Sequence, residues 1–191
     1  MGRRIIYVHG FNSSPHSAKA VTLGHYLRQH HADIDYQVPQ LPGDALTAVA
    51  MVEALVTSWQ GTVGLVGSSL GGFYATVVAE RHQLPTVLIN PAVAPHRLLA
   101  GYLGMQHNPY TGEQYLLDDS QLAVLEELMP AAPWMGRYWL LLGTADDVLD
   151  YRDALAWYGP SPAEIEQGDD HALRHFPRHL PALVDFLFPS P

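Results

Sequence analysis

The pentapeptide at residues 67–71, Gly-Ser-Ser-Leu-Gly, constrains the fold of this chain more than any other part of its sequence. It matches G-x-S-x-G, follows the apolar run 63–66 and precedes small and apolar residues suited to a helix. In a sharp strand-to-helix turn, bulky side chains two positions either side of the serine would clash. Ser68 would need glycines where Val66 and Leu70 stand, so the pattern predicts Ser69 as the exposed nucleophile. No lysine follows, which argues against a phosphate-binding loop.

The rest of the chain alternates short apolar runs with longer segments of helical period. A chain of this kind is expected to form one domain, residues 1–191, around a mostly parallel sheet of about six strands with helices on both faces. Asp44 is the expected N-cap of the second helix. The expected strands are 5–8, 34–38, 62–66, 86–89, 138–142 and 163–165, and the expected helices include 15–30, 44–59, the segment from the pentapeptide to about 81, and 175–188.

Residues 90–137 interrupt this alternation, since no convincing strand stands out among them. The segment is too long for a plain connection in a compact domain. We expect it to be a helical cap or lid inserted after the fourth strand, with a short helix near 120–129. The alternative is an extra packing layer without substrate contact.

A serine hydroxyl needs a base to take its proton, and the base needs a third group to orient it. The expected chain order is serine, acid, histidine. Asp146 and Asp147 follow the strand predicted at 138–142, and Asp146 is favoured because Val148 is expected to turn inward. His171 is the predicted base, because it lies late in the chain in a loop after the last strand.

A tetrahedral oxyanion needs backbone N–H donors already in place. One predicted donor is the N–H of Leu70, directly after the nucleophile. The second is the N–H of Phe11, in the loop after the first strand, where Gly10 would allow close approach. Asn12 or Ser13 in the same loop is also expected to cap the next helix.

His175 and His179 follow His171 at four-residue steps, a spacing that could suggest a metal site. Pro177 interrupts the stretch, and no partner carboxylate of the H-E-x-x-H kind is present. The prediction is therefore two surface helix histidines and no metal.

Composition narrows the possible partners. A formal net charge of -9 disfavours nucleic acid and anionic membrane surfaces. The absence of cysteine excludes disulfides, cysteine-ligated zinc and thiol catalysis, and agrees with a cytoplasmic location. The apolar run at 5–8 is too short for a signal peptide, and no run approaches membrane-spanning length.

Several longer motifs resemble the YqiA-type family of bacterial esterases over nearly the whole chain. The resemblance implies a compact, cytoplasmic three-layer α/β-hydrolase fold acting on short acyl esters without a cofactor. It also implies Ser69, Asp146 and His171 as catalytic residues. The family tends to have Glu where Asp147 stands and Asn where Asp170 stands. The motifs lie at 7–15 with 17–20, 67–76, 90–93, 108–112 and 146–151.

Together these features predict a serine esterase that hydrolyses a small short-chain carboxylic ester through an acyl-enzyme. An acyl thioesterase acting on acyl-CoA or acyl carrier protein would use the same triad, but only 10 Lys and Arg residues are available, without an evident cluster for phosphates. A binding module that lost activity is a further alternative, although every triad member is present. The insertion supplies residues that are either acyl-pocket walls or packing: Tyr102, Leu103, Tyr110, Met105 and Tyr115.

Overall fold

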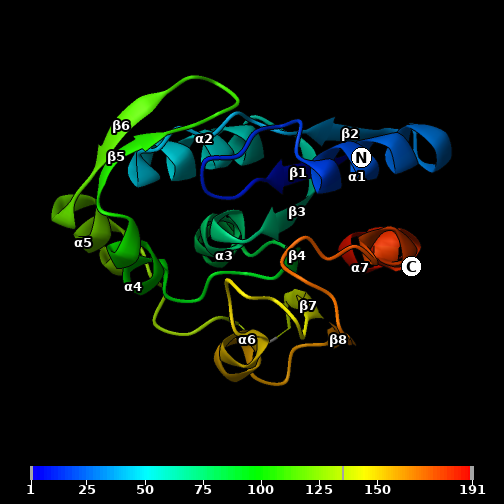
Figure 1. Cartoon of the computed structure of the whole chain (residues 1–191). Helices are drawn as coiled ribbons and strands as arrows, with labels where there is room; N and C mark the ends of the chain where they lie inside the picture. Colours follow the sequence, from blue (N-terminus) through cyan, green and yellow to red (C-terminus); the bar gives the residue numbers. More distant parts are fainter. Residues whose placement is uncertain (1, 135, 190–191) are drawn as a thin grey trace.

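A six-stranded parallel sheet lies at the centre of the structure, a computed structural model that describes residues 2–134 and 136–189 (Figure 1). The strand order is β2-β1-β3-β4-β7-β8, and every neighbouring pair is parallel. The predicted parallel sheet is confirmed. Its strands are β1 (Gly2–Val8), β2 (Ile34–Gln37), β3 (Gly61–Ser68), β4 (Thr86–Ile89), β7 (Tyr138–Gly143) and β8 (Ala163–Glu166).

Helices cover both faces of the sheet, which gives the three layers expected (Figure 1). Two helices pack on one face, α1 (Ala18–His30) and α7 (Leu180–Leu187). Three pack on the other, α2 (Ala45–Thr57), α3 (Leu70–His82) and α6 (Tyr151–Tyr158). The helix expected at 175–188 begins as the 3-10 turn η2 (Phe176–His179) before it continues as α7.

The side chains of β1 alternate between these two layers. Ile5 and Tyr7 pack against the α1 and α7 side, whereas Ile6 and Val8 pack against the α2 and α3 side. All four are at most 1% exposed. This period of two is the consequence of a pleated strand buried on both faces, and it fixes the register of β1 between its neighbours. Asp44 caps α2 as predicted, accepting a hydrogen bond of 2.8 Å from the Thr47 N–H.

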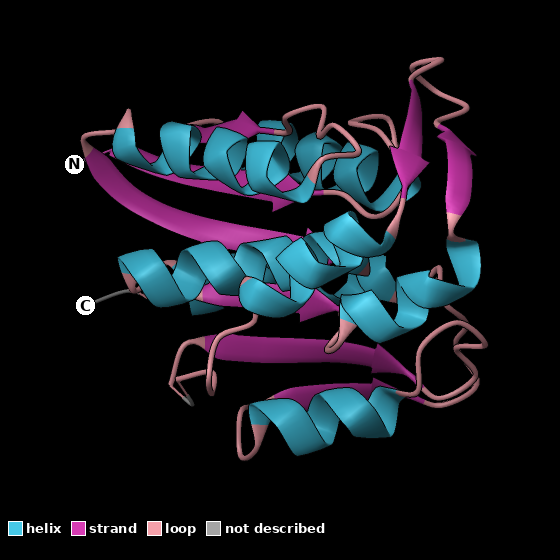
Figure 2. Ribbon diagram, turned by 90° about the vertical axis from the view of Figure 1, so that its left-hand side faces the viewer, coloured by secondary structure: helices cyan, strands magenta, loops and turns pink. Residues whose placement is uncertain are grey.

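The chain between β4 and β7 contains both helices and a hairpin. Its elements are α4 (Pro95–Leu99), η1 (Ala100–Tyr102), the antiparallel strands β5 (Gly104–His107) and β6 (Gln114–Leu117), and α5 (Asp119–Glu127). The expectation of a helical insertion without a strand is therefore wrong for its middle part, although the helix expected near 120–129 is present as α5. Figure 2 shows this segment beyond the ends to which the arrows of the main sheet point. No helix in the described ranges is long and apolar enough to cross a membrane.

Candidate active site

Ser69 lies in the sharp turn between β3 and α3, with φ 57° and ψ -125°. This left-handed backbone conformation is strained for a residue with a side chain, at about 1–3 kcal/mol. A Cβ atom at Gly71 would lie 2.0 Å from the carbonyl oxygen of Val8, and one at Gly67 would lie 2.6 Å from the Gly71 oxygen. Both glycines are thus required by close backbone approach.

Backbone hydrogen bonds to the end of β4 and to the loop after it hold this turn in place. The Ser69 N–H donates to the oxygen of Ile89 at 3.0 Å. The Ser69 oxygen accepts from the N–H groups of Gly72 at 2.9 Å and Ala92 at 3.0 Å. The position of the serine is therefore set by two neighbouring strands as well as by its own turn.

Asp146 and His171 come from the loops after β7 and β8 and meet in a hydrogen bond of 2.7 Å between Asp146 Oδ2 and His171 Nδ1. The other oxygen of Asp146 accepts from the N–H groups of Val148 at 2.8 Å and Leu149 at 2.9 Å. The Asp146 side chain is 1% exposed, whereas Asp147 is exposed to solvent. Burial alone would raise the pKa of Asp146, but the hydrogen bonds from His171 and the two N–H groups hold it below its usual value.

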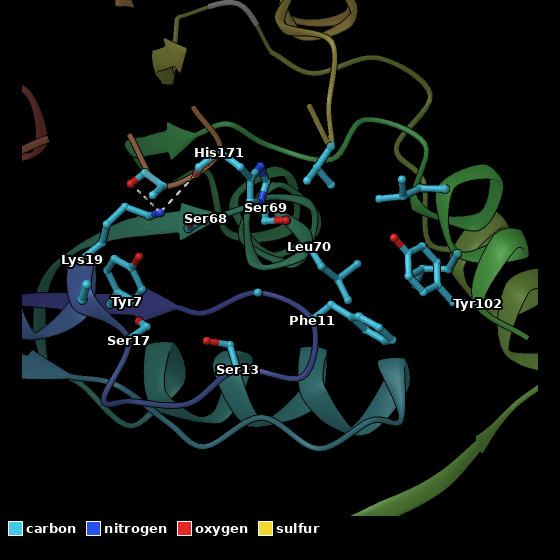
Figure 3. Close-up of a pocket in the computed structure, with 16 residues that line it drawn as sticks. Tyr7, Phe11, Ser13, Ser17, Lys19, Ser68, Ser69, Leu70, Tyr102 and His171 are labelled. Atoms are coloured by element: carbon cyan, nitrogen blue, oxygen red, sulfur yellow. Dashed lines mark hydrogen bonds between the residues drawn. The ribbon is translucent and has the colours of Figure 1, made fainter. Parts of the chain in front are cut away.

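The imidazole of His171 lies beside the Ser69 side chain, and both residues border the same cavity (Figure 3). Because the carboxylate of Asp146 accepts from Nδ1, the proton of the neutral ring is assigned to Nδ1 and Nε2 is free to act as a base. Within the described residues, Ser69 and His171 form no direct hydrogen bond. Such contacts often tighten only when substrate is bound.

The loop after β1 runs directly past the serine. A Cβ atom at Gly10 would lie 3.2 Å from the Ser69 Cβ, so glycine permits this approach. His9 anchors the loop, because its Nε2 accepts from the Leu41 N–H at 3.0 Å and its Nδ1 lies 3.0 Å from the Gly10 oxygen. Burial lowers the pKa of His9, which favours the neutral ring that this pattern needs. No local pattern in the sequence distinguishes His9 as a functional residue.

The N–H groups of Phe11 and Leu70 donate to no other protein atom in the described ranges. Both residues line the cavity that contains Ser69. The capping role expected of Asn12 or Ser13 is not observed, since the N-cap of α1 is Ser17. The Asn12 side chain instead accepts a hydrogen bond of 2.9 Å from the Tyr115 hydroxyl, because the hairpin of the insertion lies close to this loop.

Asn90, directly after β4, connects the loops of the acid and the base. Its Oδ1 accepts from the N–H of Gly143 at 2.9 Å. Its Nδ2 lies 3.3 Å from the oxygen of Asp170 and 3.2 Å from that of His171. The side chain is buried, with only 4% of the residue exposed, and φ is 40°. In the sequence, residues 90–93 stand out only as a motif shared with the family, and this contact is not predictable from them.

The cavity at Ser69 has a volume of about 340 Å³. Tyr102, from the insertion, lines it together with Leu98 and Leu99, so the insertion forms one wall. The other residues proposed as pocket walls do not line this cavity. Leu103, Met105 and Tyr110 are 47%, 67% and 62% exposed, and Tyr115 lines a small neighbouring cavity instead.

The expectation of two surface histidines at 175 and 179 is wrong for His179. Its residue is 8% exposed, and its Nε2 lies 2.5 Å from Glu166 Oε1. His175 is exposed, and its Nδ1 lies 3.0 Å from Asp169 Oδ1. Glu166, Asp169 and His175 bring ligand-type atoms within 4.8 Å of one another, but Glu166 already pairs with Arg178 and His179. The group is accounted for as an ion-pair network beneath the loop that carries His171.

A parallel sheet with a serine on a strained turn after one of its inner strands, and with a histidine and an aspartate on later loops, is the arrangement of the α/β-hydrolase fold. Several solved structures with this fold are similar to this chain over most of their own length. Est1E from Butyrivibrio proteoclasticus has a TM-score of 0.74 at 17% identity, covering 97% of this chain and 86% of its own. Alpha/beta hydrolase domain-containing protein 10 from mouse has a TM-score of 0.71 at 17% identity, covering 95% and 89%. A pyrethroid hydrolase from Sphingobium faniae JZ-2 has a TM-score of 0.65 at 19% identity, covering 100% and 99%.

Residues 4–188 match the model of the family described as "Uncharacterised protein family (UPF0227)", and the chain belongs to this family. It is the YqiA-type family that the sequence motifs resemble.

Proposed function

We propose that this protein is a serine esterase that hydrolyses short-chain carboxylic esters through an acyl-enzyme on Ser69. The observation that carries the proposal is the 2.7 Å hydrogen bond between Asp146 and His171, beside a serine held on a strained turn in the same cavity. A base oriented by a buried carboxylate, next to a serine hydroxyl that borders a cavity, is the arrangement that activates a serine.

In the proposed reaction, His171 Nε2 takes the proton of Ser69 as the hydroxyl oxygen attacks the acyl carbon. The N–H groups of Leu70 and Phe11 donate to the oxyanion of the tetrahedral intermediate. His171 then returns the proton to the leaving alcohol. Water then attacks the acyl-enzyme with His171 again as base, and His171 returns this proton to the Ser69 oxygen as the acid is released. Asp146 stabilises the imidazolium formed in each half of the reaction.

A short acyl group is supported by the size and lining of the cavity. About 340 Å³ must hold the reacting ester, and the wall beside Phe11 and Leu70 is apolar, formed by Leu98, Leu99 and Tyr102. Apolar pockets discriminate chain length weakly, at about 1–3 kcal/mol per methylene. We therefore expect a gradual decline in kcat/KM with acyl length and no sharp cut-off.

A fluorophosphonate probe, which reacts with activated serines, tests the nucleophile. Wild type and Ser68→Ala should both form a covalent adduct, and Ser69→Ala should form none. Peptide mass spectrometry should place the adduct on Ser69. An unlabelled wild-type protein would contradict the proposal and favour a binding module.

A series of p-nitrophenyl esters from acetate to decanoate, measured beside acyl-CoA thioesters of the same lengths, tests the substrate class. We expect the highest kcat/KM among the short esters. A higher kcat/KM for long thioesters would show that the protein is a thioesterase working with the same residues.

A further inference from the structure

The cavity around Ser69 has two chemically different halves. Figure 3 shows Ser69 and His171 between them. One half is apolar and contains Phe11, Leu70 and Tyr102. The other half contains a cationic side chain and several hydroxyl groups: Lys19, Tyr7, Ser13, Ser17 and Ser68. An apolar acyl group accounts for the first half only.

Lys19 is the only lysine in the sequence. Its Nζ donates to the backbone oxygens of Ala172 at 3.0 Å and His171 at 3.5 Å, the dashed lines of Figure 3. An ammonium group has three N–H donors. Two are directed at the loop that carries the base, which leaves one for a group in the cavity.

Lys19 also differs from the other half-buried cations of the described ranges, because no carboxylate forms an ion pair with it. Arg4 pairs with Asp35 at 2.5 Å, and Arg137 pairs with Glu80 at 3.5 Å. Burial lowers the pKa of Lys19, while the more distant charges of Asp146 and Asp170 raise it in part. A partly desolvated ammonium without a direct counter-ion is unfavourable, and an anionic ligand would relieve this.

We propose that Lys19 binds a carboxylate on the alcohol part of the ester substrate, and this inference rests on the proposed esterase function. We choose the alcohol side because His171 must reach the leaving oxygen of the alcohol. Lys19 donates a hydrogen bond to the backbone oxygen of His171 and therefore lies on the same side of the cavity. The hydroxyls of Tyr7, Ser17 and Ser68 line the same half of the cavity and can donate further hydrogen bonds to this polar end. The preferred substrate is thus an apolar short acyl group joined to an acidic alcohol or phenol.

Two esters of nearly the same shape test this assignment, the butyrate esters of 4-hydroxybenzoate and of 4-hydroxybenzamide. They differ in the charge of the leaving group, and comparing wild type with variants cancels their different intrinsic reactivity. In Lys19→Met, the ratio of kcat/KM for the carboxylate ester to that for the amide ester should fall about tenfold or more, mainly through KM. Lys19→Arg should keep most of the preference.

Arg97→Met is the matched control, because it removes one positive charge from an exposed side chain that does not line the Ser69 cavity. In this variant the ratio of kcat/KM for the two esters should stay within about twofold of wild type, because exposed charges have small effects. If Lys19→Met lowers kcat/KM equally for both esters, Lys19 only holds the His171 loop in place, and the proposal is overturned. A preference that appears only when the carboxylate is on the acyl group would overturn the assignment to the alcohol side.

A binding measurement separates failure of this inference from failure of the esterase proposal. In Ser69→Ala protein with isotopically labelled lysine, the Cε–Hε signal belongs to Lys19 alone. It should shift with the 4-hydroxybenzoate ester and half-saturate at a lower concentration than with the amide ester. An equal response to both esters, or none, would contradict anion binding whether or not the wild-type protein hydrolyses either compound.

Discussion

Asn90 shows how a single buried amide can hold two loops of an active site. Its oxygen accepts from the end of β7, near Asp146, and its nitrogen lies against the backbone of Asp170 and His171. Asn90→Gly removes the side chain while tolerating the observed φ of 40°. We expect kcat to fall by about tenfold to a hundredfold through misplacement of His171, with a smaller change in KM.

The same substitution should lower the free energy of unfolding by about 2–3 kcal/mol, since three hydrogen bonds to a buried amide are lost. Fluorophosphonate labelling rates measured below the unfolding transition separate the two effects. A variant that is destabilised but labelled at the wild-type rate would show that Asn90 has only a structural role.

The neighbouring acids Asp146 and Asp147 offer a matched pair of substitutions. Asp146→Asn should lower kcat by about 10³–10⁴-fold, because an amide cannot hold the His171 proton on Nδ1 or stabilise the imidazolium. Asp147→Asn should change kcat by less than about twofold, since this carboxylate is exposed. Ester hydrolysis by the two purified variants checks both values, and equal losses would contradict the proposed role of Asp146.

The sequence predicts residues whose local pattern is specific and misses those that act over long separations. Ser69 follows from its flanking glycines, and the Asp146–His171 contact follows from chain order and strand ends. Lys19 reaches the backbone oxygen of Ala172, 153 residues away, and no local pattern encodes such a contact. Asn90 was missed for the same reason.

Among the elements, α3 packs directly against the backbone at the end of β1 through Gly71. A methyl group there would meet the Val8 oxygen at 2.0 Å, so Gly71→Ala must displace the helix that carries Ser69. We expect a loss of about 3 kcal/mol or more in unfolding free energy, measured by urea denaturation. Gly101→Ala is the control, because nothing lies within 4 Å of its added carbon, and it should change stability by less than about 1 kcal/mol. Similar values for both variants would contradict the argument from close packing.

The hairpin of the insertion illustrates why an element can escape sequence analysis. β5 and β6 pair only with each other, and most of their side chains are exposed or half-buried. They therefore lack the continuous apolar runs of the main strands. Their position depends on contacts with distant loops, such as the bond between Tyr115 and Asn12. The central strands are buried on both faces, so their continuous apolar runs predict them much more clearly from the sequence.

At the scale of the whole molecule, Glu166 makes the stability of the protein depend on pH. Its ion pairs lie next to the loop that carries His171. Burial raises its pKa, but the hydrogen bonds and charges of Arg178 and His179 outweigh this and hold it below its usual value. A lowered folded-state pKa means that the carboxylate stabilises the protein at neutral pH. This stabilisation should be lost as the pH falls below the ordinary glutamate pKa and through the lowered value.

Glu166→Gln should lower the unfolding free energy by about 2 kcal/mol at pH 7, and the difference from wild type should shrink steadily toward pH 3. Urea denaturation at a series of pH values measures this. Glu164→Gln, at an exposed position of the same strand, should match wild type throughout. If the difference in unfolding free energy between Glu166→Gln and wild type is the same at all pH values, the charge of Glu166 is not the cause of its stabilising effect.

The strained turn at Ser69 is tied by its N–H to Ile89 at the end of β4, and by its oxygen to Ala92 in the loop that follows this strand. A loop held only by local contacts could relax its strain through small openings, whereas this turn can relax only if the central strands separate. The amide proton of Ser69 should therefore exchange with deuterium as slowly as those of β3, at a rate set by global unfolding. Ageing or heating should then destroy the nucleophile's geometry and the fold in a single step, without a preceding folded but inactive form.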